Sequence, residues 1–295
     1  MRVVPLFASC LAILALLALP DARAADPERE LRLQAPANAR QGTAVRVTAF
    51  IDAFAPGEEP EILFSWLKKR VRARAVRDGT RWRAETLVPV GVNAGKKLVV
   101  HASTPTGAAK ADARLSVAAV AWPEQRISVN KNYVTPPKDV LSRIKAERAR
   151  SAQAVARVTP ERLWEDGFVR PVPGVVTSAF GGKRMFNGKM RSYHRGVDLR
   201  GAQGTPIRAL AGGEVVLAEN MYYSGNVVYL DHGQGVISLY CHMSSMNVQP
   251  GDRVRAGQVL GKVGATGRVT GPHLHLGLLI LGEAVDPLSL LAESK

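Results

Sequence analysis

The stretch NVVYLDHGQGVISLYCHM, residues 226–243, predicts two antiparallel β-strands joined by a tight turn. β-branched and aromatic residues dominate both halves, and glycines surround His232 between them, which is typical of a β-hairpin. Alternation along the second strand places Tyr240 and His242 on one face and Cys241 on the other. We therefore expect Cys241 to pack inward, away from the histidines, as neither a ligand nor a nucleophile. We expect His232, at the turn, to be structural.

Further glycine-punctuated strand patterns surround this hairpin and predict an antiparallel β domain over residues 161–291. Five of the six histidines of the chain lie after residue 190. In YHRGVDLR, residues 193–200, an extended backbone would place His194 and Asp198 on one face, with space at Gly196 between them. An imidazole and a carboxylate at this spacing can reach a common zinc ion, although the pair alone is a weak signal.

The stretch TGPHLHLG, residues 270–277, adds two histidines two positions apart. In a strand, His273 and His275 point the same way and Leu274 points to the opposite face. A catalytic zinc site needs three protein ligands and an open position for water. Neighbouring histidines can transfer protons and stabilise an oxyanion. The candidate residues divide into three ligands and two helpers, and spacing alone leaves open which are which. They are His194, Asp198, His242, His273 and His275.

The segment 25–121 predicts an all-β domain, because six or seven short alternating or β-branched runs are separated by turn residues. This number of strands in about a hundred residues favours an immunoglobulin-like sandwich. Val71 and Ala73 alternate with arginines, and Asp78-Gly79 predicts a hairpin turn. The arginine face could bind an anionic wall polymer, but such a face is more often simply a solvated sheet face. His101 stands alone in a strand and is interpreted as structural.

Residues 122–160 predict an extended and then helical connector. Pro136-Pro137 can open a helix. The stretch that follows has apolar residues at helical spacing. The residues expected to face inward are Val140, Leu141, Ile144 and Ala152.

The first 24 residues predict a secretory signal peptide, because a positive start and an apolar run precede the triplet Ala22-Arg23-Ala24. A membrane anchor is the alternative, but a cleavage site follows the run. Cleavage removes Cys10 and leaves Cys241, so no internal disulfide is expected. The net charge of +15 fits an anionic partner in the cell envelope or serves solubility.

Residues 165–291 resemble the lysostaphin-type, or LytM-type, zinc endopeptidases of bacterial cell walls. The resemblance is carried by His194-x-x-x-Asp198, Tyr240-x-His242 and His273-x-His275, and by GDRVRAGQVLGKVGATG and VDPLSLL. It implies that His194, Asp198 and His275 bind Zn²⁺, and that His242 and His273 act in proton transfer and oxyanion stabilisation. It also implies the duplicated hybrid motif of that family, an antiparallel β fold with the site in a groove.

The implied function is a zinc-dependent peptidoglycan endopeptidase that cuts wall peptide stems or cross-links, with the D-alanyl–diaminopimelate bond expected by analogy. The implied partner is peptidoglycan and not nucleic acid, and the location is the periplasm or envelope, with no membrane span after signal cleavage. A monomer is expected. Some relatives have lost their ligands and only activate wall amidases, so a non-catalytic regulator is the alternative. A lipoyl-type carrier is disfavoured, because the expected hairpin carries no lysine.

Overall fold

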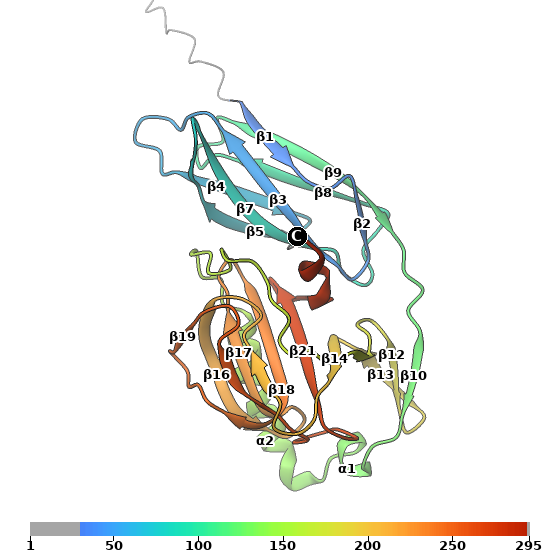
Figure 1. Ribbon diagram of the computed structural model, residues 1–295. Helices are drawn as coiled ribbons and strands as arrows, with labels where there is room; N and C mark the ends of the chain where they lie inside the picture. Colours follow the sequence, from blue (N-terminus) through green and yellow to red (C-terminus); the bar gives the residue numbers. More distant parts are fainter. Residues whose placement is uncertain (1–29, 294–295) are drawn as a thin grey trace, which may run out of the picture.

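The computed structural model describes residues 30–293 and consists mostly of β-strands with few helices (Figure 1). The predicted signal peptide, residues 1–24, lies outside the described residues. Among the residues described, no helix is both long and apolar enough to cross a membrane.

The N-terminal part contains two β-sheets that share one hydrophobic cluster, in which Val47, Phe64 and Val100 are fully buried. The first sheet has the order β1-β3-β7-β6, and the second has the order β2-β9-β8-β4-β5. The strands are β1 Leu31–Gln34, β2 Asn38–Arg40, β3 Ala44–Ile51, β4 Glu61–Trp66, β5 Lys69–Arg74, β6 Val76–Asp78, β7 Arg81–Pro89, β8 Lys97–Ser103 and β9 Lys110–Ala118. This two-layer arrangement agrees with the predicted sandwich, while its immunoglobulin-like topology stays a prediction.

Local patterns in this part confirm two expectations. In β5, Val71 and Ala73 are buried and the intervening arginines are exposed. Strands β6 and β7 pair antiparallel across Asp78-Gly79, where Gly79 takes a positive φ of 62° that the tight turn requires.

The connector starts with strand β10 (Glu124–Ile127), which pairs in parallel with β12 of the C-terminal part. It continues through α1 (Lys131–Val134), the short 3₁₀ helix η1 (Lys138–Val140) and α2 (Leu141–Val155). Figure 1 shows this segment running along the C-terminal part from β10 to α2.

The prediction of the inward face of α2 was partly wrong. Ile144 is buried, but Leu141 and Ala152 are exposed. Glu147 is buried in their place, where its carboxylate accepts the backbone N–H of Tyr222 (2.9 Å) and a bond from Arg143 Nε (2.6 Å). A paired carboxylate can therefore occupy an inward helix position that an apolar pattern does not reveal.

The C-terminal part is a ten-stranded sheet with the main order β11-β14-β21-β18-β17-β16-β19. Strands β15 and β20 pair with each other, β20 also pairs with β18, and β22 pairs with β21. Its strands are β11 Val176–Ser178, β14 Gly196–Arg200, β15 Pro206–Arg208, β16 Gly213–Met221, β17 Gly225–Asp231, β18 Val236–Met246, β19 Arg253–Val254, β20 Val259–Val263, β21 His273–Ile280 and β22 Glu283–Val285. All their pairings are antiparallel, as predicted.

A smaller sheet of β10, β12 (Lys183–Phe186) and β13 (Lys189–Tyr193) lies beside this main sheet, and the 3₁₀ helix η2 (Pro287–Glu293) follows it. Strands β18 and β21 carry apolar side chains on both faces. Tyr240, Leu274 and Leu276 belong to one buried cluster, whereas Ile237 and Cys241 belong to a second cluster that α2 covers through Ala154. The central strands are thus fixed from both sides, and they hold the ends of β14 and β21 rigidly in register.

Candidate metal centre

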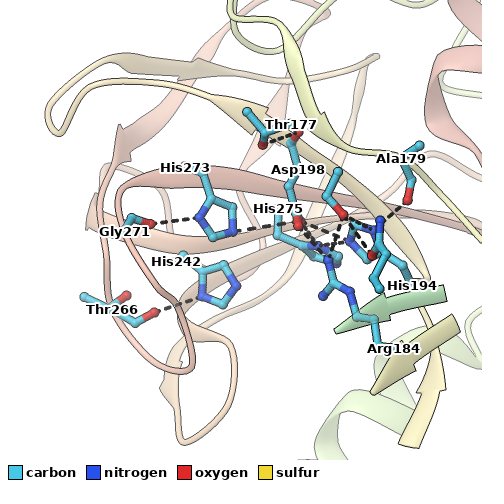
Figure 2. Close-up of polar contacts among 12 residues, drawn as sticks. Thr177, Ala179, Arg184, His194, Asp198, His242, Thr266, Gly271, His273 and His275 are labelled. Carbon is cyan, nitrogen blue, oxygen red and sulfur yellow. Dashed lines mark hydrogen bonds and ion pairs between the residues drawn. The ribbon is translucent and has the colours of Figure 1, made fainter. Parts of the chain in front are cut away.

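Strands β14 and β21 bring the predicted ligands together. Their register pairs Asp198 directly with His275, so both side chains project from the same face of the sheet. His194, just before β14, completes the group. Asp198 Oδ1 lies 3.0 Å from His194 Nε2 and 2.7 Å from His275 Nδ1, and the two nitrogens are 3.1 Å apart (Figure 2). These three residues form a cluster that could hold a metal ion.

Gly196 makes this convergence possible. A Cβ atom at this position would lie 2.9 Å from His275 Cε1 and 2.3 Å from the carbonyl oxygen of Leu276. Any larger residue would therefore displace the His275 ring or separate the strands. The space predicted at Gly196 is confirmed, and it is occupied by the His275 ring.

The hydrogen bonds of His194 determine which of its nitrogens faces the cluster. Its Nδ1 lies 2.8 Å from the carbonyl oxygen of Ala179. Because a carbonyl can only accept, Nδ1 carries the proton and Nε2 presents a lone pair to the cluster. Burial lowers the pKa of His194 and outweighs the opposing effect of the neighbouring Asp198 carboxylate. At neutral pH the imidazole is a neutral ligand of the kind that zinc takes.

Asp198 is ionised in this setting. Burial opposes its charge, but the neighbouring imidazoles of His194 and His275 outweigh burial and hold its pKa well below the usual range. Two imidazoles and one carboxylate with converging lone pairs fit Zn²⁺ by donor chemistry.

His242 and His273 lie next to this cluster with their rings 5.0 Å apart, and the His242 ring is 6.1 Å from that of His275. His242 Nδ1 donates to the carbonyl oxygen of Thr266 and His273 Nδ1 donates to that of Gly271, each at 2.9 Å (Figure 2). In the neutral form of each ring, the proton is therefore on Nδ1 and Nε2 carries the lone pair. His273 Nε2 lies 3.8 Å from Asp198 Oδ1, so this nitrogen faces the metal-ligand cluster.

His242 reaches the site through an irregular backbone. Its φ of 66° is in the left-handed region, which is uncommon for a residue other than glycine. The pairing of β18 with β20 also shifts register between Met243 and Ser245. Burial and the nearby imidazoles of His275 and His273 lower the pKa of His242 to about 3, so at neutral pH the ring is neutral and its Nε2 carries a lone pair.

The comparisons with known proteins agree with this geometry. Residues 192–287 match the model of Peptidase family M23. The structure also superposes on the crystal structure of a Pseudomonas aeruginosa protein assigned to peptidase M23, with a TM-score of 0.60 and 32% sequence identity. That match covers 83% of this chain and 92% of the other. The chain belongs to peptidase family M23.

Two relatives with known names are similar to a part of the chain. The DD-carboxypeptidase/endopeptidase Mpg of Neisseria meningitidis is 44% identical over 97 residues, which are 33% of this chain and 22% of that protein. The peptidoglycan DD-endopeptidase ShyC of Vibrio cholerae is 40% identical over 114 residues, which are 38% of this chain and 26% of that protein. The chain thus matches about a quarter of these relatives' lengths. The predicted resemblance to cell-wall peptidases is confirmed at the level of the M23 family.

One prediction about the M23 site was wrong. Cys241 does not face away from the histidines, because it is the direct cross-strand partner of His275 and shares its face. The left-handed backbone at His242 breaks the alternation on which the prediction depended. Cys241 is nevertheless buried, and burial raises the pKa of its thiol to about 12. This agrees with the expectation that it is neither a nucleophile nor a ligand.

The two histidines interpreted as structural lie away from the cluster. His232 is fully buried, with Nδ1 2.6 Å from the carbonyl oxygen of Gly212 and Nε2 2.7 Å from Ser238 Oγ. His101 is an exposed residue of β8, where its Nδ1 lies 2.7 Å from Asp112 Oδ1.

Sequence reasoning missed two arginines at the M23 site. Arg184, from β12, donates to Asp198 Oδ2 at 2.6 Å and to Ser178 Oγ at 3.2 Å (Figure 2). Residue spacing does not predict which residues of β12 and β14 meet, so the sequence alone could not predict this contact. Arg200 lies two residues after Asp198, on the same face of β14, and the alternation applied to His194 and Asp198 would have found it.

Proposed function

We propose that the chain is a zinc-dependent peptidoglycan endopeptidase. The observation that carries this proposal is the convergence of three lone-pair donors, His194, Asp198 and His275, beside the imidazoles of His242 and His273. Membership of family M23 supports a peptidase, and the two relatives named for DD-endopeptidase activity support a wall peptide as substrate.

In this proposal His194, Asp198 and His275 hold Zn²⁺. A bound zinc ion would polarise the scissile carbonyl and lower the pKa of a water molecule toward neutrality. Arg184 fixes Asp198 by engaging Oδ2, which leaves Oδ1 toward the two imidazoles.

His242 and His273 would move the protons. Each has its Nδ1–H fixed by a backbone carbonyl and its Nε2 free to accept the proton of the attacking water. Once protonated, that Nε2–H can stabilise the developing oxyanion or return the proton to the leaving amine.

The proposed bond is the D-alanyl–diaminopimelate cross-link, by analogy with relatives named DD-endopeptidases. This substrate implies export, for which the predicted signal peptide provides the route. The location would be the periplasm or cell envelope, and zinc is the expected cofactor.

The test is hydrolysis of purified sacculi by the mature chain, with mass analysis of the released fragments. We expect zinc-dependent release of cross-link fragments and its loss with a chelator. A matched control is His101→Ala, which removes a histidine outside the site. A protein that holds no zinc and releases no fragment would contradict the enzyme and support a non-catalytic regulator.

A further inference from the structure

A groove of about 440 Å³ lies beside Asp198 and His273, and nothing in the preceding mechanism uses its far end. One side is formed by β11, β14 and the segment before β21. The other side includes Gln125 and Ile127 of the connector strand β10. Gln125 is held there because its Oε1 accepts a hydrogen bond from Ser178 Oγ at 3.2 Å. The connector therefore forms part of the groove beside the proposed metal ligands.

Arg200 lines this groove, and the register of β14 and β21 fixes its position relative to the proposed metal ligands. It is the cross-strand partner of His273, as Asp198 is the partner of His275. Directly opposed residues on one face have Cβ atoms about 5 Å apart. The pair of Arg200 and His273 is thus the next pair on this face of β14 and β21 after the pair of Asp198 and His275. Arg200 is exposed, and its guanidinium makes no hydrogen bond or ion pair with the side chains that the structure describes.

The charge of this groove is unbalanced. Its charged lining residues are Arg184, Arg200 and Asp198. Arg184 is paired with Asp198 at 2.6 Å, so their charges compensate each other. One positive charge, that of Arg200, remains for an incoming group. An unpaired guanidinium has the fork geometry that binds carboxylates with two parallel hydrogen bonds.

We propose that Arg200 binds a substrate carboxylate next to the scissile bond and selects for wall peptides that carry one there. This rests on the proposed function, because it assumes that the peptide bond is cut beside His273. In a D-alanyl–diaminopimelate cross-link, the carbon that bears the acylated nitrogen also carries a carboxylate. A carboxylate so near the scissile nitrogen is within reach of Arg200, whose pair with His273 lies next to the proposed ligands. The free C-terminal carboxylate of a stem is a second source of the same chemistry.

The experiment compares three cross-linked stem-peptide dimers. The first has both carboxylates free, the second is amidated at the diaminopimelate carboxylate beside the cross-link, and the third is amidated at the stem C-terminus. The proteins are the wild type, Arg200→Gln and Arg200→Lys. The control is Arg255→Gln, which removes an equal exposed charge next to β19, at the opposite edge of the sheet. The measurements are kcat, KM, zinc content and equilibrium binding of each dimer to chelator-treated protein.

With the free dimer, we expect Arg200→Gln to lower kcat/KM about 10- to 100-fold, mainly through KM, because a charge-assisted bond is lost. Zinc content and kcat should stay close to wild type, Arg200→Lys should recover part of the loss, and Arg255→Gln should have no effect. Amidation at one of the two positions should lower the kcat/KM of the wild type about as much as Arg200→Gln does with the free dimer. With that amidated dimer, the wild type and Arg200→Gln should have the same kcat/KM. The position at which this occurs identifies the carboxylate.

Two results would overturn the inference. One is that Arg200→Gln weakens all three dimers equally, and the other is that the wild type does not distinguish them. Binding separates these results from failure of the proposed function. If no dimer is cut but Arg200-dependent binding of the free dimer persists, the groove assignment stands and the hydrolytic function is wrong. If dimers are cut with no dependence on Arg200, the function stands and the groove assignment is wrong.

Discussion

Two groups of polar side chains in the same sheet, one around the buried His232 and one around the buried His194, differ in how their protons are distributed. Around His232, the Nδ1–H donates to the carbonyl oxygen of Gly212, and the hydroxyl of Ser238 donates to Nε2. Tyr240 Oη lies 3.0 Å from Ser238 Oγ and accepts the N–H of Leu210 at 2.7 Å. Every lone pair that faces inward has a donor, so this group is complete without a ligand.

The group of His194, Asp198 and His275 has the opposite balance. His194 has used its proton on Ala179, and Asp198 is ionised, so acceptor atoms face one another at 2.7–3.1 Å. Too few protons are present to pair them all, and a cation can satisfy them together. Each group is built around a buried imidazole, that of His232 or that of His194. The count of donors against acceptors is what separates a structural histidine from a candidate ligand.

The largest effect should come from His275→Ala, which removes one acceptor from the incomplete group. With two ligands left, we expect zinc to be lost on dialysis and hydrolysis of sacculi to be abolished. Metal content by atomic absorption and fragment release would measure both. His101→Ala is the matched control, and full zinc occupancy in His275→Ala would show that His275 is not a ligand.

A smaller loss should follow from His273→Ala, because the three ligands stay in place. We expect zinc content to be unchanged and turnover to fall by about 10²- to 10⁴-fold, the usual contribution of a positioned acid or base. Single-turnover hydrolysis together with metal content would test it. A variant that loses its metal would instead place His273 among the ligands.

The contrast between the two groups was only partly visible in the sequence. Strand alternation correctly placed His273 with His275, because β21 is regular. It also placed His194 with Asp198, although His194 lies just before β14. The same rule failed at His242 and Cys241, where a left-handed residue changes which side chain faces the site. Assignment of His194, Asp198 and His275 as ligands rested on family resemblance, since spacing does not specify where protons lie.

The fold was predictable to a similar extent. Two β-rich parts and a helical connector followed from periodicity, because alternating burial is a local property. The contact of Arg184 with Asp198 and the placement of β10 beside β12 depend on long-range pairing. Local patterns carry no information about such contacts. The inward Glu147 of α2 escaped prediction because its partner Tyr222 is 75 residues away.

A substitution in the group of His232, Ser238 and Tyr240 should change stability and leave catalysis unchanged. Tyr240→Phe removes the hydroxyl that accepts the N–H of Leu210. Because that buried N–H is left without a partner, we expect the free energy of unfolding to fall by about 1–3 kcal/mol. Zinc content and specific activity should stay at wild-type values. Urea unfolding monitored by circular dichroism measures the first, and a loss of zinc would show that the two groups are coupled.

The smallest effect concerns the pH dependence of stability. Burial lowers the pKa of His232 from 6.5 to about 4, so the folded state resists protonation. Between these two values the unfolded chain binds a proton that the folded chain does not, and stability therefore decreases as the pH falls. From pH 7 to pH 5.5 this residue should cost about 1 kcal/mol.

The comparison variant for this last prediction is His232→Gln, whose amide can donate to Gly212 and accept from Ser238 but does not titrate. Other groups with lowered pKa values, such as His242, contribute equally to both proteins and cancel in the difference. We therefore expect the stability gap between wild type and His232→Gln to narrow by about 1 kcal/mol from pH 7 to pH 5.5. Urea titrations at both pH values measure it. A gap that does not change with pH would mean that His232 is protonated as easily in the folded as in the unfolded chain, and the proton arrangement assigned to the complete group would then be wrong.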